Sequence, residues 1–192
     1  GLGAAVAGVL GDAPAAVQNI VSGVINAGPL TADNGLTVQM FAADGTTLLG
    51  TSKVTGTGAF SVDVGDYTGV VIAKVVDSGD GGDYIDEATG VSKDLNAMLT
   101  AVFVVTGSGF SANINPVTTI AAIKAGVAAD GSVAKAITET EVAEAIATVE
   151  NALGLTDITS GTVVTTVNVD GTSNVASANN YGKVLAALSG ID

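Results

Sequence analysis

The sequence predicts an α+β protein in which an antiparallel β-sandwich comes first and a flank of about three helices follows. Short apolar runs with alternating polarity and glycine-rich turns fill residues 18–112, as is typical of half-buried strands. Asn115 and Pro116 then indicate a helix start, because asparagine caps helices and proline fits the first helical position. Thr138 and Glu141 form a capping box that opens a second helix.

The chain is therefore expected to have three parts. Residues 1–17 form an apolar tail, residues 18–112 the sandwich, and residues 113–192 a helical flank that packs on the sandwich as one compact unit. Helices with a single apolar stripe need a surface to lie on, and the sheet supplies one.

The strands of the sandwich are predicted from their polarity patterns. The runs are 20–25, 36–40, 48–54, 59–64, 69–76 and 101–105. Phe60 and Val62 alternate with Ser61 and Asp63, which is the pattern of a strand with one buried face. The run 69–76 is apolar on both faces and is therefore predicted to be a central strand.

The helices of the flank are predicted from apolar residues at helical spacing. These positions are Val117, Ile120, Ala121, Val127 and Ala128 in the first helix, Val142, Ala145, Ile146, Val149 and Leu153 in the second, and Tyr181, Val184, Leu185 and Leu188 in the third. Gly154 is expected to end the second helix, and the third to start near Ser177 and end at Gly190. Residues 162–169 alternate in polarity and are predicted to form an edge strand.

Composition excludes several classes of function. The chain has 192 residues, 19 acidic side chains, 6 lysines and a net charge of −13, so nucleic acids and anionic lipids are disfavoured partners. It has no cysteine and no histidine, which removes thiol nucleophiles, disulfides, imidazole bases and ordinary zinc sites. We therefore expect a protein that is not an enzyme.

The expected location is outside the cell, at the cell surface. The sequence has no run of eighteen apolar residues, so no transmembrane helix is predicted. A chain rich in Gly, Ala, Val and Thr with only 13% charged residues is typical of prokaryotic surface proteins. The start of the sequence lacks a methionine and a basic segment, and we interpret it as a processed or truncated terminus.

The apolar segment over residues 1–11 is the predicted assembly element. Its apolar side chains are those of Leu2, Ala4, Val6, Val9 and Leu10, with glycines between them. An exposed apolar strand promotes aggregation unless something covers it. Two interpretations remain open: the segment packs on its own domain, or it adds as a strand to a neighbouring subunit.

The acidic loop over residues 77–87 is the candidate metal site. Its carboxylates are those of Asp77, Asp80, Asp83, Asp86 and Glu87, set in a glycine-rich stretch. Such oxygens suit calcium, although the loop lacks the ligand spacing of an EF-hand. A hairpin loop that uses Asp and Gly for its turns explains the same composition without metal.

Two short matches to cofactor or catalytic motifs are attributed to chance. Residues 132–135 read Ser-Val-Ala-Lys, as in penicillin-binding enzymes, but the partner motifs of that family are missing. Residues 107–112 match a dinucleotide-binding fingerprint, but no βαβ unit surrounds them.

Lys74 is unusual because it lies within an otherwise apolar strand. A buried amine has to be paired, neutral or chemically consumed. One hypothesis is an isopeptide bond to an asparagine, as in some Ig-like pilin modules, and the alternative is an amine that reaches solvent along its stem. An intact mass equal to that of the full sequence would exclude the bond.

The sequence also resembles a family of secreted bacterial modules. Residues 21–25, 36–38, 44–45 and 58–62 resemble carboxypeptidase-regulatory-like (transthyretin-like) and related Ig-like modules, and residues 84–90, 115–122 and 181–189 are similar to bacterial surface and adhesin-like proteins with a helical flank. The resemblance implies an Ig-like sandwich in a secreted module with no enzymatic activity.

Two hypotheses of function follow. In the first, the protein is a structural subunit of a surface fibre, a homo-oligomer or polymer assembled partly by strand complementation through residues 1–11. The alternative is a ligand-binding adhesin module that depends on calcium.

Overall fold

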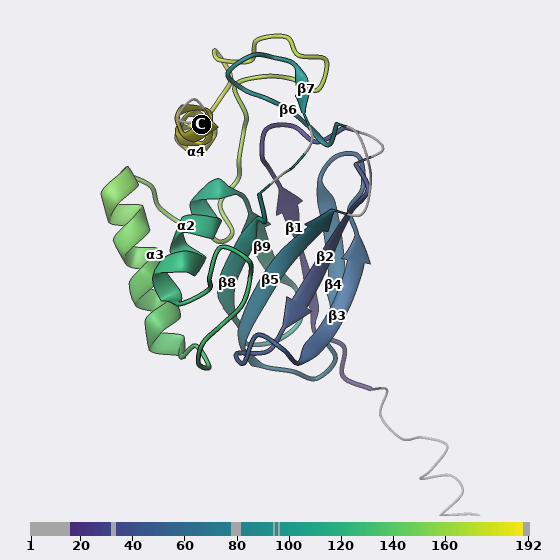
Figure 1. Cartoon of the computed structure of the whole chain (residues 1–192), viewed down its shortest axis with the longest axis vertical. Coiled ribbons are helices and arrows are strands. Elements are labelled where there is room, and N and C mark those ends of the chain that lie inside the picture. The colour runs from purple at the N-terminus through teal and green to yellow at the C-terminus, as the bar shows by residue number, and fades with distance from the viewer. Residues whose placement is uncertain (1–15, 32–33, 78–81, 94, 96, 190–192) are drawn as a thin grey trace, which may run out of the picture.

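A computed structural model describes residues 16–31, 34–77, 82–93, 95 and 97–189 (Figure 1). It confirms the α+β class: strands fill the first part of the chain and helices α2 (Pro116–Ala125), α3 (Glu139–Leu153) and α4 (Asn180–Ser189) fill the second. The strands form a sheet of three, a sheet of four and a short hairpin.

The smaller sheet has the strand order β4-β1-β9. Strand β1 (Ile20–Ile25) pairs antiparallel with β4 (Ala59–Asp63) and parallel with β9 (Phe110–Ile114). The sandwich was expected to be antiparallel, so the β1–β9 pair is a local exception. β9 also crosses the boundary predicted after residue 112, because the sheet continues until Asn115 caps α2.

The larger sheet has the strand order β3-β2-β5-β8, with all its pairs antiparallel. Its strands are β2 (Leu36–Phe41), β3 (Leu48–Lys53), β5 (Gly69–Asp77) and β8 (Thr100–Val105). β5 is a central strand, as its two apolar faces predicted.

The inner faces of the two sheets share one core, which is mainly aliphatic. Val21 and Val62 from the smaller sheet and Val38, Val71 and Phe103 from the larger one belong to the same buried cluster. Alternate residues of each strand point into this cluster, which is the period expected of a sandwich.

The outer face of β5 and β8 is covered by helices (Figure 1). Ile72 and Val102 pack there against Ala122 of α2 and against Val142 and Ala145 of α3. This second core explains why β5 and β8 are apolar on both faces.

A buried polar network joins the sandwich to the helices. The side chain of Asn115 caps α2 by accepting from the backbone amide of Thr118 (3.0 Å) and donates to the hydroxyl of Tyr181 on α4 (2.8 Å). That hydroxyl donates in turn to the carbonyl of Ile158 (2.8 Å). Asn113 of β9 donates to the same carbonyl (3.1 Å) and to that of Gly161 (2.7 Å).

Several predictions about the helical flank were wrong. Helix α2 ends at Ala125, before Val127 and Ala128, and α4 begins at Asn180 rather than near Ser177. Residues 162–169 form no strand; the backbone amides of Val164 and Thr166 donate to the side chains of Asn179 and Glu87, and an isolated bridge pairs Val167 with Ser173. Ile120 was predicted to face the core but is 40% exposed. Helix α2 instead buries two neighbouring faces that consist mainly of small residues, and Ile120 lies on neither of them.

Candidate functional site

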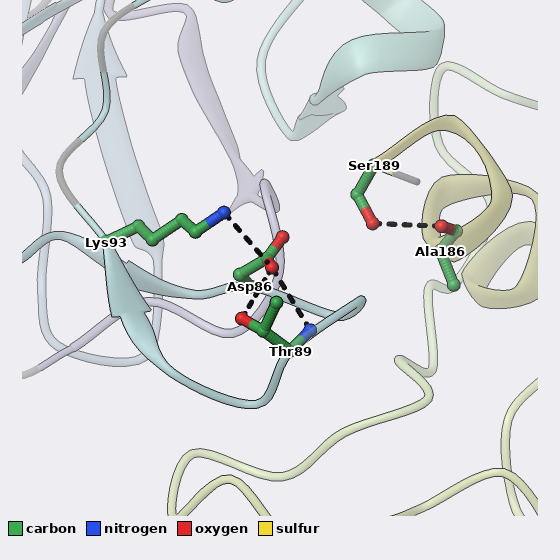
Figure 2. A network of polar contacts seen from close by, with 5 residues as sticks. All are labelled: Asp86, Thr89, Lys93, Ala186 and Ser189. Atoms are coloured by element: carbon green, nitrogen blue, oxygen red, sulfur yellow. Dashed lines mark hydrogen bonds and ion pairs between the residues drawn. The ribbon is translucent and has the colours of Figure 1, made fainter. Parts of the chain in front are cut away.

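A pocket of about 380 Å³ lies at one end of the sandwich, where residues 95 and 97–99 meet three elements. These are the hairpin of β6 (Tyr84–Ile85) and β7 (Ser92–Lys93), the first turns of α2 and the last turn of α4. Figure 2 shows hairpin residues Asp86, Thr89 and Lys93 across from Ala186 and Ser189 of α4.

The wall of this end pocket is mainly apolar. Its apolar side chains include Leu95, Met98, Leu99, Ile120 and Leu188. A volume of this size is at the small end of the range for ligand sites. The pocket therefore suits a small apolar group or a few apolar side chains of an entering segment.

Several polar groups of the wall are engaged within the chain. Ser189 donates to the carbonyl of Ala186 (2.9 Å), and the hydroxyl of Thr119 lies within hydrogen-bond distance of the Asn115 carbonyl (2.8 Å). The carboxylate of Asp86 accepts from the Thr89 hydroxyl (2.7 Å) and lies 3.3 Å from the amine of Lys93 (Figure 2). Because these polar groups are already paired within the chain, the pocket presents mainly its apolar side chains to a ligand.

The surroundings of Asp86 favour its charged form. Burial by itself would raise the pKa of Asp86, but the hydrogen bonds from Thr89 and Lys93 and the charge of Lys93 together lower it. The charge of the buried carboxylate is thus stabilised by Thr89 and Lys93 of the same hairpin, and these contacts hold the turn between β6 and β7.

The candidate calcium ligands have different surroundings. Asp77 ends β5 opposite Leu36, and Asp80 lies outside the described residues. Buried Asp83 accepts from the backbone amide of Leu95 (2.8 Å). In the described part of the chain, no group of three acidic side chains is arranged to hold a metal ion. Calcium binding stays a prediction, because Asp80 belongs to the proposed set.

Glu87 connects the hairpin to the loop before α4. Its Oε1 accepts from the amide of Thr166 (3.3 Å), whereas its Oε2 is buried and has no hydrogen-bond partner among the described residues. Burial raises the pKa of Glu87, the Thr166 amide opposes this, and the charge of Asp86 adds to it. A buried, unpartnered charged oxygen costs stability.

We expect Glu87→Gln to raise the free energy of unfolding at pH 7 by about 1 kcal/mol, because the variant can keep the bond to Thr166 and loses the buried charge. The pKa of Glu87 is higher in the folded state than in the unfolded state. The parent protein is therefore most stable with respect to this group below the unfolded pKa, and it loses that stability as pH rises through the folded pKa. The stability advantage of Glu87→Gln over the parent should therefore grow between pH 4.5 and pH 7. Urea denaturation at several pH values measures it.

A matched control for this variant is Glu144→Gln, which removes the same charge from an exposed position on α3. If both variants gain equally, net charge rather than the buried oxygen of Glu87 sets the effect. A Glu87→Gln variant that is less stable than the parent at pH 7 would contradict the argument.

Lys74 is held by non-covalent contacts. Its amine donates to the carbonyl of Gly45 (3.1 Å) and lies 4.3 Å from the centre of the Phe41 ring. Burial lowers the pKa of Lys74, and the charge of Asp130 opposes the shift. The isopeptide hypothesis stays open to the mass measurement, but these contacts account for a half-buried amine without a covalent bond.

The two motifs attributed to chance have structural roles. Ser132 donates to Asp130 (2.6 Å), whereas the amine of Lys135 lies 4.0 Å from Glu141. Ser132 and Lys135 are therefore paired with different carboxylates. Residues 107–112 form the turn between β8 and β9 and the first part of β9.

The predicted assembly residues lie outside the described residues. These are Leu2, Ala4, Val6, Val9 and Leu10. Their placement, in the same chain or in a neighbour, stays a prediction.

Sequence reasoning missed the end pocket and the Asn115–Tyr181 contact. Leu95 and Leu188 are too far apart in the sequence for a local pattern to join them. The sequence did contain a signal for the hairpin. Asp86 and Thr89 are three residues apart, which is typical of a turn that an aspartate side chain closes. Gly90 follows them with a positive φ of 70°.

Comparison with models of known protein families and with curated proteins finds no match. In the described ranges, no helix is long and apolar enough to cross a membrane.

Proposed function

We propose that this protein is a non-catalytic, extracellular structural subunit that polymerises into a surface fibre. The observation that supports this most is the end pocket, an apolar recess in which Asp86, Thr119 and Ser189 are engaged within the chain. Such a recess favours an apolar partner over a polar substrate.

Composition supports the same proposal. A chain without cysteine and histidine lacks the side chains most used for nucleophilic and acid–base catalysis. The sequence also carries an apolar segment, residues 1–11, which needs a protein surface to cover it. An Ig-like sandwich with a helical flank in a secreted module is part of this proposal.

Deletion of residues 1–11 tests the proposal. We expect the full chain to form polymers that sediment and are visible by negative-stain electron microscopy, and the deletion variant to lose them. Circular dichroism and thermal unfolding should show that the sandwich still folds. A full chain that stays monomeric at every concentration would contradict a fibre subunit.

A matched pair of variants controls for the length of the chain. Val6→Asp with Leu10→Asp places charges in the apolar segment and should abolish polymers, whereas Gly3→Ser with Gly8→Ser changes the same segment and leaves its larger side chains in place. Equal loss in both pairs would indicate that apolar contacts are not the cause.

The alternative is a calcium-dependent adhesin module. It is favoured by the buried, unpartnered Oε2 of Glu87 beside Asp86 and by the net charge of −13. The same assays, run with calcium and with a chelator, separate the two functions. An adhesin of this kind gains thermal stability with calcium and remains monomeric.

A further inference from the structure

The end pocket and the start of the described chain lie at opposite ends of the molecule. Strand β1 begins at Ile20, at the end away from α4, and runs toward the end that carries the β6–β7 hairpin (Figure 1). Ala27, which follows β1, lines the pocket. Any segment that precedes Ala16 therefore joins the fold at the end far from the pocket.

The first residues of the chain are apolar, as is most of the pocket wall. Residues 1–11 contain no charged side chain, and their largest side chains are those of Leu2, Val6, Val9 and Leu10. Such a segment enters an apolar recess without the cost of burying a charge. Because it carries no charge, it adds no repulsion of its own toward a second copy of a chain whose net charge is −13.

Length permits contact between copies. Residues 1–15 precede the described part and reach at most about 50 Å when fully extended. To reach the pocket of its own chain, the segment would have to run back along the whole sandwich. To reach the pocket of a following copy, it only has to continue away from its own fold.

We propose that a few apolar side chains of residues 2–10 of one copy enter the end pocket of the next, so that copies join head to tail. This inference rests on the proposed fibre function and names its acceptor site. A contact between two different surfaces of identical subunits produces an open filament unless the rotation closes a ring. Asp86, which lines the pocket, is paired with Lys93 of the hairpin.

Disulfide cross-linking tests the contact directly, because the native chain has no cysteine. Val6→Cys protein is mixed with Ile120→Cys protein under mild oxidation, and the mixed disulfide is identified by peptide mass spectrometry. Ile120 lines the pocket and is 40% exposed. Ile123 lies on the same helix and is 50% exposed, but it is not part of the pocket wall. Ile123→Cys is therefore the matched control. We expect about tenfold more mixed disulfide with Ile120→Cys, because binding raises the local concentration of the pair.

The outcomes separate the inference from the function on which it rests. Polymers with equal cross-linking at positions 120 and 123 would overturn the pocket contact and leave the fibre proposal standing. In a double variant with both Val6→Cys and Ile120→Cys, a monomer that carries the disulfide within one chain would place the segment in its own pocket and overturn both. Absence of both polymers and cross-links would also overturn both.

Discussion

Replacement of Asn115 by alanine should lower the free energy of unfolding by about 2–4 kcal/mol. The loss of a helix cap costs typically about 1 kcal/mol, and a buried group left without its partner adds about 1–3 kcal/mol. Asn115 is fully buried and serves both purposes, since it caps α2 and donates to Tyr181. Urea denaturation followed by circular dichroism measures the loss.

Tyr181→Phe separates the two contributions of Asn115. It leaves the cap of α2 intact and keeps the ring in the core that α2, α3 and α4 share, but removes the hydroxyl that joins Asn115 to the carbonyl of Ile158. We expect a smaller loss than for Asn115→Ala, and a double variant less destabilised than the sum of the two. Strict additivity would show that the contact between the two side chains contributes nothing.

Local sequence patterns predicted the parts of the fold that depend on local chemistry. The start of α2 follows from Asn115 and Pro116, and the start and end of α3 follow from Thr138 and Gly154. The two apolar faces of β5 correctly predicted a strand covered on both sides.

The parts that were missed depend on contacts distant in sequence. The parallel pairing of β9 with β1 brings Ala112 opposite Gly23, and no local pattern in the mixed sequence of β9 indicates that partner. Residues 162–169 have the alternation of a strand, but Asn179 and Glu87 supply the hydrogen bonds that a neighbouring strand would have supplied. Alternation alone does not decide which partner the backbone finds.

The candidate site shows the same limit. The spacing of the acidic residues suggested one cluster, yet burial placed Asp83 against a backbone amide and Asp86 against Thr89 and Lys93. A carboxylate in a glycine-rich loop is equally suited to a metal ion or to the turns of its own hairpin. Only the three-dimensional contacts of each carboxylate distinguish the two roles.

Phe103→Ala is expected to have the largest effect, a loss of about 3–5 kcal/mol in the free energy of unfolding, because the variant leaves a cavity in a packed core. Phe103 lies on β8 of the larger sheet with 1% of its surface exposed. Its ring stacks on that of Phe110 from β9 of the smaller sheet, with ring centres 5.2 Å apart. In a chain with only 4 phenylalanines and no tryptophan, this pair is a main aromatic contact between the sheets.

Phe110→Ala is the matched control for Phe103, because the two rings share one contact and differ in burial. Phe110 is half-buried, so its loss should be clearly smaller, and the cycle of the two variants should show a coupling of about 0.5–1.5 kcal/mol. Chemical denaturation of the four proteins measures this coupling. Equal losses for the two single variants would mean that the stacked pair, and not the cavity left by Phe103, sets the stability of this side of the sandwich.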